Sequence, residues 1–187
     1  MKLKWLLLLV LICCCSCDRI YGLLHKPGGE EREILGPVVF NEYNPRVEEL
    51  QKIFRLFGYT LGRTDGKFGA STREAVAKFQ EEEGLPVTRF VDKATWGRIQ
   101  EYVQSPLIHK LELNVKSLQL ALKKAGFFPG KVDGRLGPQT REAVKAFQQA
   151  HDLNADSLIG LKTIKALLPD VLSPQKPVQV EGQAGQQ

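Results

Sequence analysis

The apolar positions of this chain predict six helices, three in each of two stretches. In the first helix of the first stretch, apolar residues recur every three or four positions, which places them on one face of an α-helix. This stripe consists of Val47, Leu50, Phe54 and Phe57. The second stretch begins with a similar stripe, made of Val115, Leu118, Ala121, Leu122 and Ala125. The second and third helices of the two stretches are predicted from the inward positions Ala75, Val76, Phe79, Trp96, Ile99, Ala143, Val144, Phe147, Ile164 and Leu167. The expected fold class is all-α.

Capping residues indicate where these helices begin and end. Asn44 can cap the first helix and Pro45 suits its first turn, while Gly58 is typical of the position just beyond a helix end. Threonine stands three residues after the expected cap of each second and third helix, in the pairs Gly69 and Thr72, Asp92 and Thr95, Gly137 and Thr140, and Gly160 and Thr163. Ser71 with Glu74 offers an alternative start for the first of these helices.

The two stretches are copies of one repeat. Residues 47–99 align with residues 115–167 without a gap, at an offset of 68 positions. The most similar segments read DGKFGASTREAVAKFQ from Asp65 and DGRLGPQTREAVKAFQ from Asp133. An ungapped match of this length indicates a duplication, so we predict two tandem domains of the same fold.

The domain boundaries follow from the repeat and from the composition of its flanks. The repeat predicts unit 1 (residues 45–100) and unit 2 (residues 113–168), joined by a linker (residues 101–112). A domain of this size is marginal alone, so the units are expected to pack together, with the linker forming a bridging helical turn or an interface strip. Residues 18–44 are predicted as a tether with a short strand over 38–40, and residues 169–187 as a disordered tail.

Residues 1–17 have the pattern of an export signal. Lys2 and Lys4 precede an apolar run from Trp5 to Cys15. This run is shorter than the ~20 residues of a membrane-spanning helix and fits the apolar core of a secretory signal. All four cysteines lie in this segment, at Cys13, Cys14, Cys15 and Cys17. The two units therefore contain neither a disulfide nor a cysteine-ligated metal.

The end of this segment resembles the lipobox of bacterial lipoproteins, in which a small residue precedes a cysteine that is acylated and becomes the N-terminus. Ser16 and Cys17 fit this pattern best, and Cys15 and Cys14 fit it less well because a cysteine would precede each of them. The resemblance implies stable anchoring by several acyl chains, and Asp18 is a residue that favours retention in the inner membrane. A plain signal peptide and an uncleaved anchor are the alternatives, and all three export the chain. The expected location is the cell envelope, anchored on the periplasmic face of either the inner or the outer membrane.

Both units follow the pattern V-x-x-L-Q…G-[YF]…D-G-x-[FL]-G-x-x-T-x-E-A-V-x-x-F-Q. This pattern resembles the peptidoglycan-binding domain found beside many bacterial cell-wall hydrolases. The resemblance implies a compact three-helix fold that holds an enzyme or another protein on the cell wall. Two places depart from the family. Asp92 replaces the usual glycine before the third helix of unit 1, and the usual Val-Asp-Gly turn reads Val-Thr-Arg at residues 87–89 and Ala-Asp-Ser at residues 155–157.

Cations and aromatic residues around the glycine-rich loop are the candidate ligand-binding residues. They are Lys67 and Arg135 inside the loop, Arg73 and Arg141 after it, and Tyr59 and Phe127 after the first helix. An arginine can pair with a stem-peptide carboxylate through two parallel hydrogen bonds, an aromatic ring can stack on a sugar, and free N–H groups at a helix start can receive a carboxylate. The alternatives are a solvated helix face for the arginines and packing under the loop for the aromatic rings.

The charge of the two units differs. Residues 114–167 carry nine Lys and Arg against four Asp and Glu, whereas residues 46–99 carry ten against eight. If charge decides binding to an anionic polymer, unit 2 is the stronger binder. The net charge of the chain is +5, or +3 without Lys2 and Lys4, which is too small an excess to indicate nucleic-acid binding.

The residues give no indication of catalysis, of a cofactor or of a metal. The three histidines, His25, His109 and His151, lack metal-ligand spacing, and the chain contains no nucleophile or phosphate-loop motif. The expected function is non-catalytic peptidoglycan binding by an exported, lipid-anchored protein that tethers the membrane to the wall through two weak sites. The alternative is an adapter that recruits or regulates a cell-wall hydrolase without contacting glycan.

Overall fold

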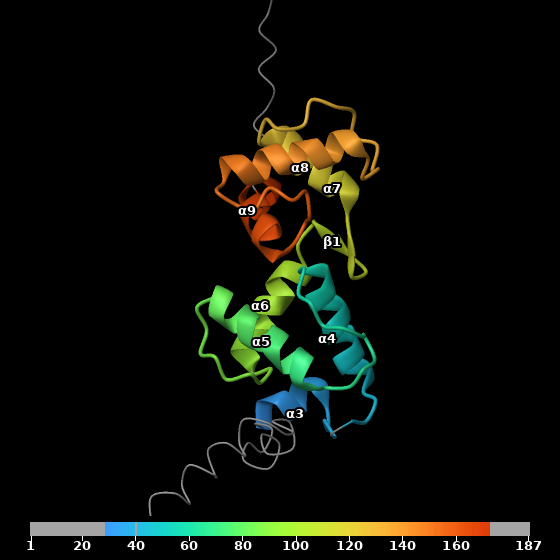
Figure 1. Cartoon of the computed structure of the whole chain (residues 1–187), viewed down its shortest axis with the longest axis vertical. Coiled ribbons are helices and arrows are strands. Elements are labelled where there is room, and N and C mark those ends of the chain that lie inside the picture. The colour runs from blue at the N-terminus through green and yellow to red at the C-terminus, as the bar shows by residue number, and fades with distance from the viewer. Residues whose placement is uncertain (1–28, 40, 173–187) are drawn as a thin grey trace, which may run out of the picture.

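The chain folds into two tandem three-helix units. A computed structural model describes residues 29–39 and 41–172. Unit 1 contains α4 (Pro45–Leu56), α5 (Ala70–Glu82) and α6 (Lys93–Val103), and unit 2 contains α7 (Val115–Lys124), α8 (Pro138–Ala150) and α9 (Leu161–Leu172). The units are stacked end to end along the long axis of the molecule (Figure 1). The prediction of an all-α fold made of two such domains is confirmed.

The predicted caps hold the helices in place. The Asn44 side chain accepts hydrogen bonds from the N–H groups of Arg46 and Val47, and the Asp92 carboxylate accepts one from Thr95 N at 2.8 Å. Gly69 and Gly137 are the N-caps of α5 and α8, so the alternative start at Ser71 is not used. Gly58 and Gly126 end α4 and α7 with φ of +88° and +84°, a conformation that suits glycine.

Aromatic rings dominate the core of unit 1, which explains why three short helices pack stably. Phe79 on α5 is fully buried. Its ring stacks on Phe57, with 6.1 Å between centroids, and meets the edge of Tyr102 at 6.5 Å. Phe54 completes this cluster at 5.9 Å from Phe79. In unit 2 the corresponding ring, Phe147, is also fully buried. Burial of such rings is the main stabilising contribution to units of this size.

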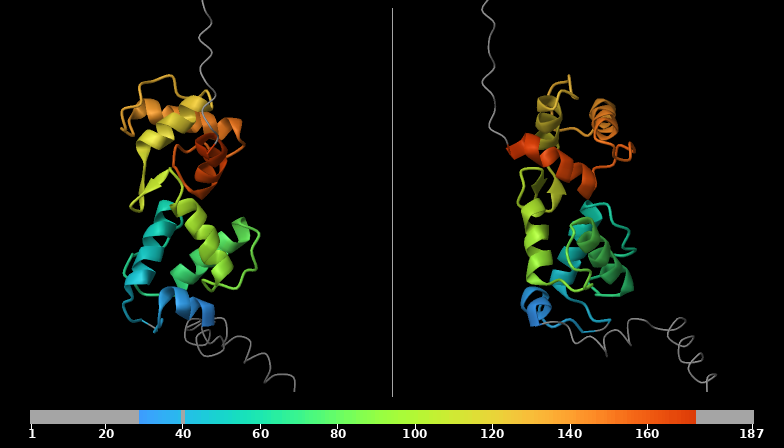
Figure 2. Two further views of the ribbon diagram at one scale, coloured as in Figure 1. Left: turned by 180° about the vertical axis from the view of Figure 1, so that it is seen from behind. Right: turned by 90° about the vertical axis from the view of Figure 1, so that its left-hand side faces the viewer.

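The segment predicted as a tether contains a helix instead. α3 (Gly29–Leu35) packs on α6, and its residues Glu31 and Leu35 are each 1% exposed. The guanidinium of Arg46 donates to the carbonyls of Ile34 and Glu33, which satisfies the C-terminal end of α3. The strand expected over residues 38–40 does not form at 38–39, and residue 40 lies outside the described residues. In all three views of Figures 1 and 2, α3 lies at the end of unit 1 that is remote from unit 2.

The linker forms a small hairpin and not a helical turn. β1 (Ile108–His109) pairs antiparallel with β2 (Glu112–Leu113), and Lys110 and Leu111 turn between them with φ of +51° and +60°. Two consecutive positive φ values are those of a tight hairpin turn. The preceding Leu107 is fully buried, so the expectation of an interface strip describes the linker better than that of a helical turn.

The last helix continues into the segment predicted as a disordered tail. α9 passes through Pro169 and ends at Leu172. Pro169 lacks an N–H and so removes one helical bond, but the apolar side chains of Leu168 and Val171 pack against the core around it. The predicted export signal and the rest of the predicted tail lie in residues 1–28 and 173–187, outside the described residues.

The two units touch each other directly. The N–H of Leu161, at the start of α9, donates to the carbonyl of Phe57 at the end of α4, at 2.8 Å. Gly58 and Gly160 face each other so closely that a Cβ at residue 160 would lie 3.0 Å from the Phe57 oxygen. Lys165 pairs with Glu83 across the same seam at 3.0 Å. In residues 29–39 and 41–172, no helix is long and apolar enough to span a membrane.

Candidate functional site

A buried glutamine fixes the glycine-rich loop of each unit. The Gln51 amide group on α4 donates to the carbonyl of Lys67 at 3.0 Å and to the Thr72 hydroxyl at 3.0 Å, and its oxygen accepts from Gly66 N at 2.9 Å. A third bond from the amide group reaches the Asp65 carboxylate. One side chain thus ties together the loop, the helix before it and the helix after it.

The same clamp occurs four times in the described residues. In unit 2, Gln119 makes the corresponding bonds to the loop that begins at Asp133 and to Thr140. Gln80 and Gln148, on α5 and α8, clamp the loops before the third helices in the same manner. At the centre of each clamped loop stands a residue with positive φ, and these are Gly66, Arg89, Gly134 and Ser157. The clamps hold each exposed loop in one conformation. A loop that is already ordered loses less conformational entropy when it binds a ligand.

The clamps also determine the electrostatics of the loops. The N–H of Lys67 donates to the Asp65 carboxylate at 3.0 Å and lowers the pKa of that carboxyl below its usual range. The Gln119 amide group, at 2.8 Å, does the same for the pKa of Asp133. Both aspartates therefore remain ionised at neutral pH and serve as loop acceptors. The Thr140 hydroxyl donates to Arg135 O and accepts from the Gln119 amide group, so it joins the loop to the clamp.

The two loop cations predicted as ligand contacts have different surroundings. Lys67 is half-buried, and its ammonium group donates to the Asn41 side chain at 3.1 Å. Arg135 is exposed, and only its main chain takes part in the clamp. Arg135 is therefore the more accessible of the two predicted contacts.

The two arginines that follow the loops differ even more, although the repeat makes them equivalent. The guanidinium of Arg73 lies over the rings of Phe68 and Phe90, at 4.4 and 5.0 Å from their centroids. It donates to the carbonyl of Arg89 at 3.2 Å and lies 3.7 Å from the Glu31 carboxylate, and its side chain is only 15% exposed. Arg141 is exposed on α8. Internal contacts thus occupy Arg73, whereas Arg141 is accessible to a ligand.

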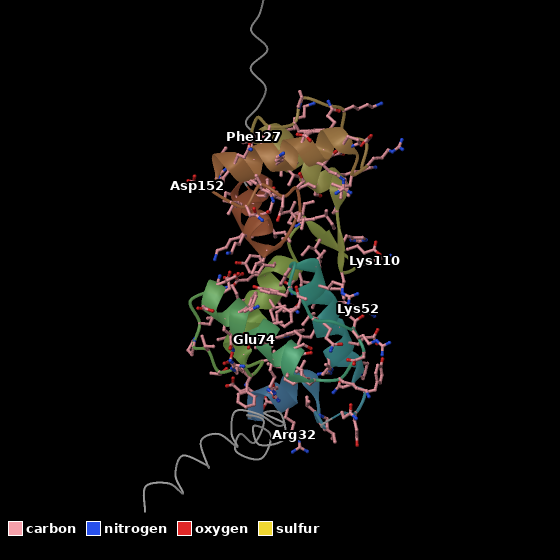
Figure 3. All side chains as sticks on the ribbon, in the orientation of Figure 1. Arg32, Lys52, Glu74, Lys110, Phe127 and Asp152 are labelled. Atoms are coloured by element: carbon pink, nitrogen blue, oxygen red, sulfur yellow. The ribbon has the colours of Figure 1, made fainter. Side chains whose placement is uncertain are left out.

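The predicted aromatic residues both pack on the core. The Tyr59 ring meets the edge of Phe54 with 5.5 Å between centroids, and its hydroxyl donates to Glu82 at 2.7 Å. Burial, together with this hydrogen bond, raises the pKa of Tyr59. Phe127 meets the edge of Phe147, also at 5.5 Å. The labelled side chains in Figure 3 run along the molecule from Arg32 on α3 to Phe127 at the far end of unit 2. Tyr59 follows α4 of unit 1 and Phe127 follows α7 of unit 2, so the two rings do not form one site.

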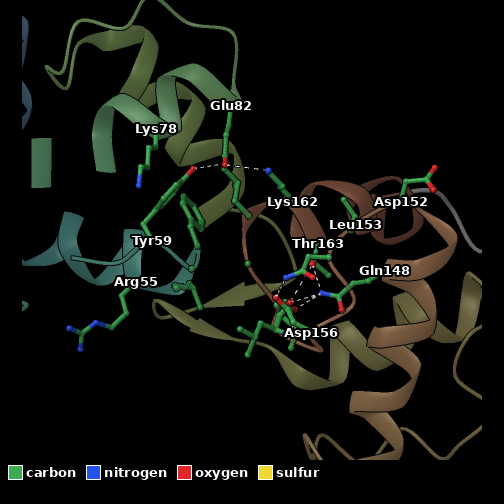
Figure 4. Close-up of a pocket in the computed structure, with 18 residues that line it drawn as sticks. Arg55, Tyr59, Lys78, Glu82, Gln148, Asp152, Leu153, Asp156, Lys162 and Thr163 are labelled. Carbon is green, nitrogen blue, oxygen red and sulfur yellow. Dashed lines mark hydrogen bonds and ion pairs between the residues drawn. The ribbon is translucent and has the colours of Figure 1, made fainter. Parts of the chain in front are cut away.

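An open groove of about 630 Å³ lies at the seam between the units. The ends of α4 and α5 form its unit 1 side, with Arg55, Tyr59 and Lys78, and the loop before α9 forms its unit 2 side (Figure 4). Glu82 lies between the Tyr59 hydroxyl and the ammonium group of Lys162, which is 3.6 Å away. Among the six residues predicted as ligand contacts, Tyr59 lines this groove. In the described part of the chain, no cluster of three His, Cys, Asp or Glu residues could hold a metal ion.

Glu31 is a buried acid, 1% exposed, that the sequence did not indicate. Its Oε1 accepts a hydrogen bond from Val91 N at 3.0 Å, and its Oε2 is buried without a hydrogen-bonding partner among the described residues. Burial raises the pKa of Glu31, against the opposite effects of the Val91 N–H and the Arg73 guanidinium, and the nearby Asp92 adds to the rise.

We expect a pH-dependent stability from Glu31 that a Glu31→Gln variant lacks. A carboxyl whose pKa is raised in the folded state binds more protons when folded, so its contribution to stability falls as pH rises from about 4.5 through the raised pKa. The urea midpoint of the wild type, measured relative to that of the variant, should therefore fall between pH 4 and pH 7. A wild type that gained stability over the variant in this interval would contradict the assignment.

Comparison with known proteins gives the same two units. A family model described as a putative peptidoglycan binding domain matches residues 43–99 and residues 112–167, which together are more than half of the chain. No solved structure matches the chain.

The similar proteins are named as amidases and are longer than this chain. The chain is 33% identical over 109 residues to the N-acetylmuramoyl-L-alanine amidase CwlM of Mycobacterium tuberculosis, covering 54% of this chain and 27% of that protein. It is 31% identical over 159 residues to the N-acetylmuramoyl-L-alanine amidase CwlL of Bacillus licheniformis, covering 68% of this chain and 43% of that protein. A probable N-acetylmuramoyl-L-alanine amidase of the same bacterium is 26% identical over 147 residues, 65% of this chain and 42% of its own. The chain thus spans less than half the length of these relatives.

Proposed function

Because this chain belongs to the family of putative peptidoglycan-binding domains, we propose that its two units bind peptidoglycan without cutting it. The observation that carries the proposal is the double match, one to each unit, together with relatives that are named as amidases of a peptidoglycan bond. The clamped loops support it, because they present exposed groups such as Arg135 on a rigid backbone. Catalysis is assigned to neither unit.

The finer part of the proposal is that the protein tethers a membrane to the wall. A lipid on Cys17, or less readily on Cys15 or Cys14, would hold the N-terminus in the membrane of the cell envelope, while the two units hold peptidoglycan. The units would act together, since two weak sites on one chain give a higher avidity than either alone. The hydrogen bond between Leu161 and Phe57 keeps the two units in one relative orientation, which sets the spacing of their sites.

Co-sedimentation with isolated sacculi tests the proposal. A preparation of residues 18–187, which lacks the export signal, should pellet with sacculi and should stay in the supernatant once muramidase has digested them. Protein that stays in the supernatant with intact sacculi would refute wall binding. The same preparation with a membrane fraction provides the control for nonspecific sedimentation.

The second candidate function is that of an adapter for a cell-wall hydrolase. The chain matches less than half of each amidase relative, so a separate enzyme could supply the part that this chain does not cover. An adapter would raise or lower the rate at which an amidase digests sacculi without pelleting with sacculi itself. Measuring amidase activity with and without the chain distinguishes the two functions.

A further inference from the structure

Glu31 fills a carboxylate-binding site on unit 1. Its carboxylate receives the N–H of Val91 at 3.0 Å and faces the guanidinium of Arg73 at 3.7 Å. The neighbouring Glu30 receives the N–H of Lys93 at 3.0 Å. These donors come from the loop before α6, from the first residue of α6 and from the first turn of α5. The carboxylates come from α3, which lies outside the repeat. Unit 1 therefore already binds a carboxylate that its own chain supplies.

Unit 2 has the same donors. At the offset of 68 residues, Arg73 corresponds to Arg141 and Val91 to Ile159. The loops that carry Val91 and Ile159 have the same geometry, because Gln80 and Gln148 clamp them with equivalent bonds at the equivalent positions. α5 and α8 also begin at equivalent glycines. Arg141 and the Ile159 N–H are therefore the unit 2 counterparts of the two groups that face Glu31 in unit 1.

The difference is that nothing in the described part of the chain fills the site of unit 2. In unit 1, α3 covers these donors. In unit 2, the contact with unit 1 pairs the Leu161 N–H with the Phe57 carbonyl but leaves the nearby Ile159 N–H without an acceptor among the described residues. Within residues 41–172, the Ile159 N–H has no acceptor and the Arg141 guanidinium has no partner. Ile159 lines the seam groove, and Arg141 is exposed. A ligand can therefore reach both donors.

We propose that unit 2 carries an open carboxylate site formed by Arg141 and the Ile159 N–H, that stem-peptide carboxylates of peptidoglycan bind there, and that Glu31 is a built-in occupant of the same site on unit 1. The choice of ligand rests on the proposed function. A guanidinium beside a backbone N–H recognises a carboxylate through charge-assisted hydrogen bonds. In unit 1 the Val91 N–H already holds one by a hydrogen bond, with the Arg73 guanidinium at ion-pair distance.

The apolar surroundings of the site fit a peptide and not a bare anion. Phe68 and Phe90, which flank Arg73, correspond to Leu136 and Leu158 in unit 2. The Leu158 side chain is 64% exposed, whereas Phe90 is half-buried against Arg73. An exposed leucine beside a carboxylate site can contact the methyl groups of an alanine-containing peptide. The excess of nine cationic over four acidic residues in residues 114–167 favours the same ligand.

Titration of the full chain in detergent micelles with soluble stem peptides tests the site. With ¹⁵N-isoleucine labelling, the Ile159 amide signal should shift, and the buried Ile164 should serve as the unperturbed reference. The same peptides with every carboxyl amidated should leave Ile159 unshifted. Arg141→Gln should weaken peptide binding about tenfold or more, as expected for loss of a charged hydrogen-bonding partner. Lys145→Gln, which removes an exposed charge of the same helix, should change the affinity less than twofold. Equal shifts with the amidated peptides, or equal affinities of the two variants, would overturn the site.

A second variant tests the occupancy of unit 1. Glu31→Ala removes the built-in carboxylate, so Glu31→Ala combined with Arg141→Gln should recover peptide binding, now detected as a shift of the Val91 amide. A double variant that binds no better than Arg141→Gln alone would overturn this part of the proposal.

Sedimentation with sacculi separates this inference from the proposed function. Wild-type protein that pellets, with Arg141→Gln pelleting equally well and Ile159 unshifted by stem peptides, would refute the site and leave wall binding intact. Protein that fails to pellet, while Ile159 shifts with stem peptides, would refute wall binding and leave the carboxylate site intact.

Discussion

Replacing Gln119 with leucine should lower the free energy of unfolding by roughly 3–5 kcal/mol, because several buried polar groups would lose their partner at once. The Gln119 side chain makes hydrogen bonds to Asp133, Gly134, Arg135 and Thr140. Leucine is of similar volume but offers no donor or acceptor, so the loop amides would remain buried and unpaired. The urea midpoint, followed by circular dichroism, measures the loss.

The matched control for this substitution is Gln149→Leu. Gln149 lies on α8 and is exposed, so its replacement should change the midpoint by no more than about 0.5 kcal/mol. A Gln119→Leu variant that unfolds at the same urea concentration as Gln149→Leu would show that the clamp does not stabilise unit 2. Loss of structure in unit 2 alone, with unit 1 intact, would show in addition that the two units unfold separately.

The second large effect is expected at the seam, where Gly160→Leu should separate the two units. A Cβ at this position would lie 3.0 Å from the carbonyl oxygen of Phe57, which already receives the N–H of Leu161. Crowding of this kind costs about 1–3 kcal/mol, and relief requires unit 2 to move away from α4. We expect a lower unfolding midpoint and a larger radius of gyration in small-angle X-ray scattering.

Gly97→Leu is the control for the same change of side chain. Gly97 lies within α6, and a Cβ there meets nothing within 4 Å. Leucine is a better helix former than glycine by roughly 0.8 kcal/mol, so this variant should be slightly more stable and equally compact. If Gly160→Leu also left the radius of gyration unchanged, the close contact of the two glycines would not determine the arrangement of the units.

The seam also explains one departure of unit 1 from the family pattern. Gly160 lies against the end of α4, where a side chain has no room. Its counterpart in unit 1 is Asp92, which caps α6 through Thr95 N. The glycine that is usual in the family therefore fits the contact between the units at residue 160, whereas the aspartate at residue 92 caps its own helix.

The sequence predicts the six repeat helices because their apolar residues are periodic and their caps are short polar residues or glycine. The same pattern does not predict α3, because its segment GEEREIL has only two apolar residues, which are adjacent and do not recur at helical spacing. Its position depends on hydrogen bonds from Val91 and Lys93, about 60 residues away along the chain. The polarity of a segment does not reveal such tertiary contacts.

The candidate site shows the same division between local and tertiary information. The exposed cations could be selected from the sequence. The sequence does not, however, distinguish a buried glutamine from a solvated one. A signal did exist, since Gln51 and Gln119 each stand 21 residues before a threonine, and Gln80 and Gln148 each stand 15 before one. The contrast between Arg73 and Arg141 arises partly from Phe68 and Phe90, which are leucines in unit 2, and partly from α3, a helix outside the repeat that the sequence did not indicate.

The docking of α3 shortens the distance over which a lipid anchor on Cys17 could hold the protein from its membrane. A free tether of residues 18–44 would have 27 residues, whereas only residues 18–28, which are 11, separate Cys17 from α3. At no more than ~3.6 Å per residue, these spans are about 97 and about 40 Å. Unit 1 would then stand close to the lipid headgroups, with unit 2 beyond it. In that geometry the distance between membrane and wall determines which unit meets the wall first. Undocking of α3 would lengthen the tether from about 40 to about 97 Å.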